Sequence, residues 1–332
     1  MPESAIEARK IQRLGSSSLV VTLPRSWIKR HGIKPGDVVY TIDEGFGLKV
    51  IPSNPAGKNT SITLDLSRIK NPYLASMSAS CVYIMGYDDV NIIFNKELDP
   101  LLMISNIKAN SSRLLGVEVV NETDTNSVRL RVLLDSTRLD IKMAVKNLSN
   151  TISMGFDLLL RIAKNEVDNE RINSDIRFIS SEIYKTQHLI IRQLVSSRGI
   201  TVGDVAEMNT HSILIGTSLL GIIGDITISI ANYMSKDNAS LDENTIEIME
   251  RVKSLLPLIG TLLTSPSVRK SSDILRDIME LRSSIEKTIN IIDSKNDTFI
   301  LSKLDTALRI MQIIAYTGYC TAIMSKDYIR LD

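Results

Sequence analysis

Cysteine, histidine and aromatic residues are scarce in this chain of 332 residues. It contains two cysteines and three histidines, and aromatic residues make up 5% of the composition. Cys81 and Cys320 lie far apart and form no C-x-x-C pair, and no histidine stands at metal-ligand spacing, which argues against a structural zinc site. We expect both thiols to be reduced and to lie in protein cores, as in a cytoplasmic protein.

The short motifs that mark common catalytic sites are also missing. No serine stands in G-x-S-x-G, no phosphate-binding P-loop is present, and no G-x-G-x-x-G follows a strand-like segment. The segment GTSLLG belongs to an apolar helical stretch and does not replace these motifs. We therefore expect a protein that is not an enzyme.

One apolar run, from Ser212 to Met234, is nearly long enough to cross a bilayer. It contains Asp225, is rich in serine and threonine, and lacks flanking basic or aromatic anchors. These features favour a buried helix of a bundle over a membrane span. The opening residues MPESAIEARK contain no apolar signal region, so we expect no membrane insertion.

Charge is distributed unevenly along the chain. The net charge is +1, but residues 1–58 carry nine Lys and Arg against five Asp and Glu, a net of +4. The remaining residues carry a net charge of −3. A basic front end before a slightly acidic remainder favours a polyanion as the partner of the front end.

A strand-rich unit is predicted at the front of the chain. The segment SLVVTLP places Leu19, Val21 and Leu23 on one face of a half-buried strand. Its proline suits the start of the short helix RSWIKRH, and a Pro-Gly turn then leads into a hairpin formed by DVVYTID and GLKVIP. Because about fifty residues bury too little apolar surface to be stable alone, we expect two copies to pair.

Periodicity and composition divide the chain into three predicted domains and give an α+β multidomain fold class. Residues 1–54 form the front unit, and SNPAGKN has the composition of a linker. Residues 60–135 combine strand-like and helix-like segments in a small α/β layer. Residues 136–332 are helical, in two sets of three segments that predict a duplicated three-helix bundle. The six predicted helices are 137–165, 170–198, 209–236, 241–264, 268–295 and 299–327.

The segment ARKIQRLGSSSLVVTLPRSWIKRHGIKPGDVVYTIDEGFGLKVIP resembles the AbrB/SpoVT/MazE family of DNA-binding domains. The likeness lies in the order of strand, Leu-Pro, short helix, GIKPGD and hairpin. It implies a swapped-hairpin β-barrel made by two chains, which binds double-stranded DNA. Cations on the first strand and on the short helix would then face phosphates and guanine edges. The expected DNA-binding residues are Arg9, Lys10, Arg13, Ser17, Arg25, Lys29 and Arg30.

The remainder is similar to the PhoU family, and the tandem arrangement resembles archaeal phosphate-uptake regulators. RLLGVEVV, HLIIRQL and GDITISIANY carry this likeness. The resemblance implies a divalent metal (Zn, Fe, Mn or Mg) held by carboxylates, and Glu182 and Asp225 are the matching candidates. The family's other carboxylates are replaced by residues such as Gly221, Gln312 and Tyr316. An alternative is structural: Asp225 pairs with a cation, for which Arg192 or Arg309 are candidates.

Together these patterns predict a homodimeric, DNA-binding transcriptional regulator of phosphate uptake. In this hypothesis the bundle senses or relays phosphate status. An alternative is an adaptor that dimerises through its front unit and contacts a phosphate ABC transporter ATPase without binding DNA. A third hypothesis is an antitoxin-like protein, which the long helical bundle disfavours because such antitoxins end in short flexible tails.

Overall fold

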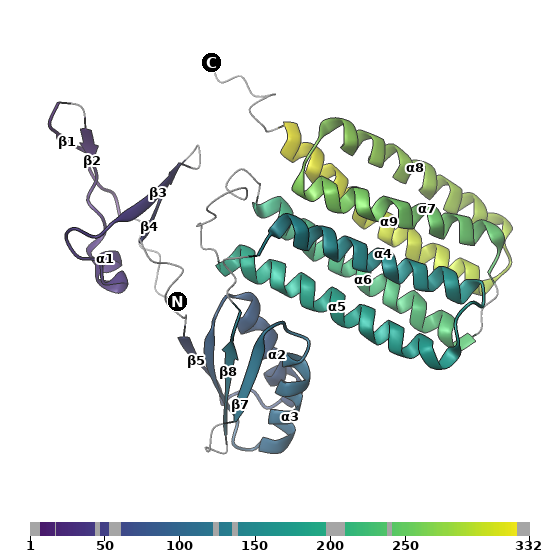
Figure 1. Cartoon of the computed structure of the whole chain (residues 1–332), viewed down its shortest axis with the longest axis horizontal. Helices are drawn as coiled ribbons and strands as arrows, with labels where there is room; N and C mark the ends of the chain where they lie inside the picture. The colour runs from purple at the N-terminus through teal and green to yellow at the C-terminus, as the bar shows by residue number, and fades with distance from the viewer. Residues whose placement is uncertain are drawn as a thin grey trace. The chain divides into compact units, whose positions relative to one another are not determined.

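The computed structural model describes residues 7–16, 18–43, 47–52, 61–121, 126–134, 139–196, 210–237 and 241–323. The chain divides into two compact units, Met1–Lys58 (unit 1) and Asn59–Asp332 (unit 2). Figure 1 shows unit 1 as a small group of strands with one helix, and unit 2 as an α/β layer followed by a long helical bundle. The predicted combination of a small front β domain and a mostly helical C-terminal region is therefore confirmed.

Unit 1 consists of two separate hairpins joined by a short helix. Strands β1 (Gln12–Leu14) and β2 (Ser18–Val20) pair antiparallel, as do β3 (Val39–Asp43) and β4 (Leu48–Pro52). The helix α1 (Arg25–His31) lies between the hairpins in the chain and follows Pro24. It ends at Gly32, whose φ of 64° and the hydrogen bond from Ile33 N to Ile28 O at 3.1 Å form a Schellman-type cap.

A hydrophobic interior is missing from the described part of unit 1. Every side chain described between Glu7 and Val50 is exposed or half-buried. Leu14, Leu19 and Leu48 keep 63%, 70% and 64% of their surface accessible. Among the described residues the two hairpins share no hydrogen-bonded sheet and no buried core, so they lack the main favourable contribution to folding. Unit 1 therefore needs another surface on which to bury these residues.

Unit 2 begins with a four-stranded sheet that carries two helices. The strand order is β5-β6-β8-β7, with β5 parallel to β6 and with β8 antiparallel to both of its neighbours. Each helix follows a strand after an N-capping side chain: Asn71 Oδ1 accepts from Tyr73 N, and Asp99 Oδ1 accepts from Leu101 N, both at 3.0 Å. The elements are β5 (Ser61–Leu66), α2 (Pro72–Ile84), β6 (Asp89–Phe94), α3 (Pro100–Ser111), β7 (Val117–Asn121) and β8 (Ser127–Val132).

Alternation along the strands gives this layer its core. The pattern of β6 is strictly alternating, so that Val90, Ile92 and Phe94 are buried. They pack with Met103 and Ile107 of α3 in a compact apolar cluster. The opposite face of the sheet is polar, and Arg129 there holds Asp89 through two hydrogen bonds of 2.6 Å.

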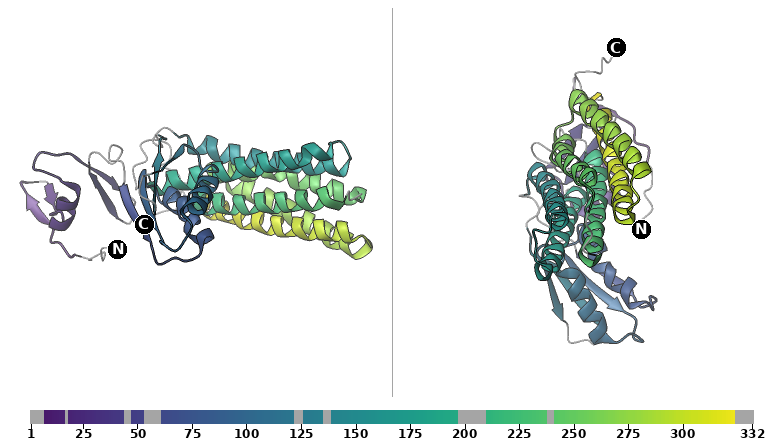
Figure 2. Two further views of the ribbon diagram at one scale, coloured as in Figure 1. Left: turned by 90° about the horizontal axis from the view of Figure 1, so that it is seen from below. Right: turned by 90° about the vertical axis from the view of Figure 1, so that its right-hand side faces the viewer.

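Six helices follow in the described part of the chain, in two sets of three. The helices α4, α5 and α6 pack against one another, and α7, α8 and α9 do the same. The pairs α4–α7 and α6–α9 join the two sets, and Figure 2 shows the helices aligned side by side. The bounds are α4 (Ile141–Ala163), α5 (Asn169–Ser196), α6 (Thr210–Asp237), α7 (Glu243–Thr264), α8 (Val268–Ile291) and α9 (Lys295–Ile323).

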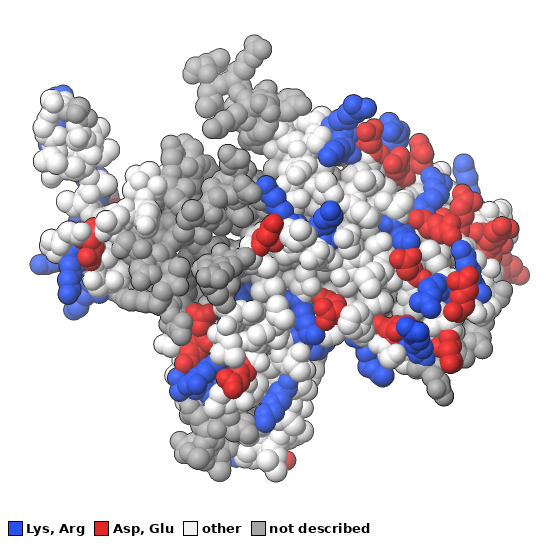
Figure 3. Space-filling view, in the orientation of Figure 1, with Lys and Arg blue, Asp and Glu red and all other residues white. Residues whose placement is uncertain are grey.

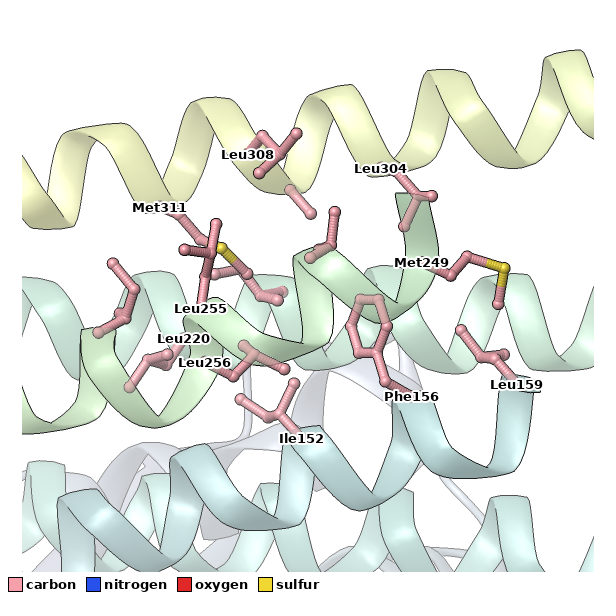
Figure 4. Close-up of a cluster of buried hydrophobic side chains, with 14 of the residues drawn as sticks. Ile152, Phe156, Leu159, Leu220, Met249, Leu255, Leu256, Leu304, Leu308 and Met311 are labelled. Atoms are coloured by element: carbon pink, nitrogen blue, oxygen red, sulfur yellow. The ribbon is translucent and has the colours of Figure 1, made fainter. Parts of the chain in front are cut away.

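One continuous apolar core holds the two sets together. Figure 4 shows Ile152 and Phe156 of α4 beside Leu256 of α7, with Leu308 and Met311 of α9 on the other side. All five side chains are fully buried. Burying a side chain of this kind contributes roughly 1.5–3 kcal/mol relative to leaving it exposed. The packing of all six helices into one cluster therefore makes the bundle a single stable body.

Helix α6 is the apolar run noted in the sequence. Within the described residues, Thr210–Lys236 has the length and a mean hydropathy of 2.0 that a membrane span would need, and half of its most apolar window is buried in the bundle. A Cβ on Gly216 would lie 2.1 Å from Leu263 Cδ2, and one on Gly224 would lie 2.9 Å from Ile183 Cγ2. These glycines therefore allow close helix packing.

The two cysteines differ from the expectation. Cys81 is exposed on α2 and Cys320 is half-buried on α9. The prediction that both are core thiols is therefore wrong for Cys81. Residues 75, 79, 82 and 83 of α2 face the layer's interior, and position 81 falls on the opposite side of the helix.

Candidate nucleic-acid interface

Three of the predicted DNA-binding cations lie on or next to the first hairpin. Arg9, Lys10 and Arg13 are exposed. Arg13 Nη2 donates to Ser16 O at 2.9 Å, which holds the side chain across the turn between β1 and β2. Arg9 pairs with Glu7, so part of its charge is neutralised in this state. Lys10 and Arg13 retain donors for a phosphate.

Helix α1 carries the second group of cations. Arg25 and Lys29 are exposed one turn apart on the same side of the helix, while Trp27 and Ile28 are half-buried. The ring centroids of Trp27 and His31 lie 5.0 Å apart, so the tryptophan packs against the histidine. Figure 3 shows basic side chains over the part of unit 1 that carries α1. The side chain of Arg30 and the whole of Ser17 lie outside the described residues.

Within the described residues, Lys10, Arg25 and Lys29 make no ion pair. Exposed cations without an intramolecular partner are available for an external anion, and arginine can also donate two parallel hydrogen bonds to a guanine edge. A second copy of unit 1 would double the set. Two such sets spaced along a surface match the repeated phosphates of a nucleic acid duplex.

Comparison with known proteins identifies this front unit. Residues 12–58 match the family model described as "Antidote-toxin recognition MazE, bacterial antitoxin". Unit 1 is thus a MazE/AbrB-like domain, and the AbrB-type part of the resemblance is confirmed. Domains of this type commonly dimerise and bind DNA, so a role in DNA-binding or antitoxin-type regulation follows for this part of the chain.

Other comparisons add little about the remainder. The chain is 30% identical over 123 residues to the DNA polymerase zeta catalytic subunit of Saccharomyces cerevisiae, an alignment that covers 34% of this chain and 8% of that protein. The chain thus spans less than a tenth of that relative. No solved structure matches the chain significantly. The PhoU resemblance of the bundle stays a prediction.

The two candidate metal ligands do not form a cluster. Asp225 is exposed on α6, and Glu182 of α5 accepts a hydrogen bond from Lys185 Nζ at 3.0 Å. Within the described residues no group of three His, Cys, Asp or Glu side chains converges as a metal site would require. The described residues therefore do not fit the divalent metal that the resemblance implied.

The predicted cation partners of Asp225 are engaged elsewhere. Arg192 pairs with Asp88, and Arg309 Nε donates to Asp305 at 2.7 Å, so the predicted pairing of Asp225 with either arginine is wrong. Partial burial raises the pKa of Asp225, and the nearby positive charge of Arg113 lowers it in part. The carboxylate lies on the exposed side of α6, with Arg113 as the nearby positive charge.

A junction that the sequence did not predict joins the α/β layer to the bundle. Arg192 of α5 is 1% exposed, and its Nη1 donates to Tyr83 O at 2.8 Å and to Tyr87 O at 2.9 Å. Its Nη2 pairs with Asp88. Burial raises the pKa of Tyr83 to about 12, and the positive charge of Arg192 acts in the opposite direction. The one available signal was an arginine within the apolar run HLIIRQLV.

A groove of about 570 Å³ opens between α4 and α7. Lys164 Nζ lies 3.1 Å from Glu250 Oε1 across it, and Lys253 pairs with Asp157. Acidic and basic side chains thus neutralise one another, so the groove does not select an ion of either sign. The nucleic-acid surface of unit 1 remains the candidate site.

Proposed function

We propose that this chain is a homodimeric DNA-binding transcriptional regulator of the cytoplasm, without enzymatic activity. Unit 1 binds the duplex as a paired MazE/AbrB-like domain. The observation that carries the proposal is the combination in one small unit of exposed cations and exposed leucines. The leucines supply a surface for a second copy, and the cations supply a surface for phosphates.

The bundle carries the finer part of the proposal. We infer that unit 2 resembles PhoU and relays phosphate status to the paired front units. The two sets of three helices support this, because a duplicated three-helix bundle is what that resemblance implies. Since no group of three His, Cys, Asp or Glu side chains converges among the described residues, we infer that the signal reaches the bundle through a partner protein or a ligand other than a clustered metal.

The experiment measures binding of the full chain to a pool of random DNA duplexes by fluorescence anisotropy at several salt concentrations. The double substitution Arg25→Ala/Lys29→Ala removes up to four phosphate contacts from a dimer. Because each contact contributes about 0.9 to the slope of log K against log salt, we expect the slope to fall by roughly 3–4.

Lys34→Ala is the matched control, because Lys34 is also exposed in unit 1 but lies in a turn outside α1. It should leave the slope nearly unchanged. Duplex binding that survives the double substitution without change would exclude α1 as the DNA-binding element. A dimer that binds no duplex even at low salt would instead favour the adaptor hypothesis, with a phosphate ABC transporter ATPase as the partner to test.

A further inference from the structure

Helix α2 carries apolar side chains on two opposite sides. Its 13 residues, PYLASMSASCVYI, contain no charged side chain. One side packs into the layer through residues such as Ala75, Ala79 and Val82. The opposite side carries a second apolar group, the α2 stripe, which consists of Tyr73, Leu74, Met77, Cys81 and the C-capping residue Met85.

The α2 stripe is exposed along its whole length. Tyr73, Leu74, Met77 and Met85 keep 66%, 56%, 43% and 54% of their surface accessible, and Cys81 is exposed as well. Positions 73, 77 and 81 recur every four residues and therefore form one line along the helix. A third side of α2 faces α5 of the bundle, where Ser80 and Tyr184 share a hydrogen bond of 2.8 Å. A helix without charged side chains is normally covered on its remaining side as well. The described part of unit 2 leaves this line uncovered.

We propose that the α2 stripe is a dimer interface, covered by the α2 stripe of a second copy of this chain. This inference rests on the pairing of unit 1 proposed above. A two-fold interface brings each surface against its own copy, so a charged surface would face charges of the same sign. The absence of any charge on α2 removes that repulsion and allows the helix to face itself.

The linker to unit 1 favours a second copy of this chain, rather than a free partner protein, as the occupant of the α2 stripe. A stable interface between free proteins buries about 800 Å² on each side, more than one helix of 13 residues offers. Eight residues, 53–60, separate β4 from β5, a distance of at most ~28 Å even when fully extended. Paired front units therefore hold two α/β layers at an effective concentration on the order of millimolar. At that concentration a small apolar interface is sufficient.

The test uses Cys81 as a reporter of the interface in the full chain. In the Cys320→Ser background Cys81 is the remaining cysteine, and we expect a short bis-maleimide to link two chains through it efficiently at low protein concentration. The matched control is Ser105→Cys in a Cys81→Ser/Cys320→Ser background. Position 105 is exposed on the neighbouring helix α3, so it is tethered equally but lies off the stripe.

A second variant, Leu74→Lys/Met77→Lys in the Cys320→Ser background, places four positive charges in the paired stripe. We expect it to lower the cross-linking of Cys81 at least tenfold while light scattering still reports a dimer held by unit 1. Circular dichroism identical to the parent confirms that the variant is folded.

Each outcome separates this inference from the proposed pairing of unit 1. A dimer in which Cys81 cross-links no faster than the thiol of the Ser105→Cys control overturns the α2 interface and leaves the front-unit dimer in place. A monomeric full chain overturns the pairing on which both depend. Cross-links found only in species larger than a dimer show contact between dimers and overturn the tethered arrangement. Slow reaction of Cys81 with a monofunctional maleimide, without cross-linking, shows that the same chain covers the stripe and also overturns it.

Discussion

At the scale of single residues, Arg192 is a buried charged group that connects the α/β layer to the bundle. It is buried at the α/β–bundle junction and donates to two carbonyl groups and to Asp88. Burial lowers the pKa of Arg192, and the Asp88 carboxylate opposes this effect. The guanidinium also stacks over the Tyr83 ring at 4.9 Å. Its several partners offset the cost of removing the charge from water.

Arg192→Leu should therefore destabilise the protein, because it removes the guanidinium that donates to Asp88, Tyr83 O and Tyr87 O from a buried site. We expect the free energy of unfolding of unit 2 to fall by about 3 kcal/mol, to be measured by urea denaturation. Arg276→Leu is the control, since Arg276 pairs with Asp273 on the exposed side of α8 and should change little. Equal effects of the two substitutions would contradict a special role of the junction.

Sequence reasoning could identify candidate cations but not their partners. Arg9, Lys10, Arg13, Arg25 and Lys29 were expected from the family resemblance and the basic charge of the front unit, and they are exposed. The partner of Arg192 is 104 residues away in the chain, so no local pattern reveals it. The position of Asp225 in the helical repeat also did not show by itself that its side chain is exposed, because the helix around it is apolar.

At the scale of helices and strands, close approach between α4 and α7 depends on one glycine. A Cβ on Gly260 would lie 2.6 Å from Ser149 Cβ. The serine side chain is short and cannot move away from this contact. Ser149 is fully buried, and its hydroxyl donates to the carbonyl of Leu256. The two helices therefore cannot accommodate a methyl group here without separating.

Gly260→Ala tests this packing with two opposed effects. In a free helix the substitution would gain about 1 kcal/mol from helix propensity, but overpacking a core costs about 1–3 kcal/mol. We expect a net loss of stability, measured by thermal and urea unfolding. Ser254→Ala on the exposed side of α7 should be nearly neutral. A variant more stable than the parent would show that the helices can move apart freely.

Many helices and strands could be predicted because periodicity is a local property. The helix predicted for 268–295 corresponds to α8, Val268–Ile291. The second strand was predicted as SLVVTLP, but β2 covers Ser18–Val20. Leu19 is exposed and Val20 is half-buried in a single chain, so the pattern indicates a surface that one copy does not complete. The exposed side of α2 could not be distinguished from its buried side by composition, because both sides carry apolar residues.

At the scale of the whole molecule, the exposed leucines of unit 1 predict the oligomeric state. Leu19→Lys in a paired unit would bury two ammonium groups per dimer. We expect the dimer to dissociate at least about a hundredfold more readily, since the cost is roughly 3 kcal/mol or more. Light scattering across a dilution series measures this change.

Ile291→Lys provides the comparison for that series, because Ile291 is 78% exposed on α8 of the bundle. It should leave the dissociation constant unchanged. If the parent chain is already monomeric at micromolar concentration, or if both variants behave alike, the front unit does not hold the molecule together.

The absence of a buried core from the described part of unit 1 has a consequence for how the protein responds to its own abundance. If unit 1 folds only by pairing, as proposed, its folding is second-order in protein concentration, whereas the bundle, with its own core, folds in a first-order process. Diluting the chain twofold then reduces the paired front units by up to fourfold while the bundle stays intact. Occupancy of DNA would therefore fall off steeply below a threshold amount of protein, and the gene's expression level itself would set when the regulator acts.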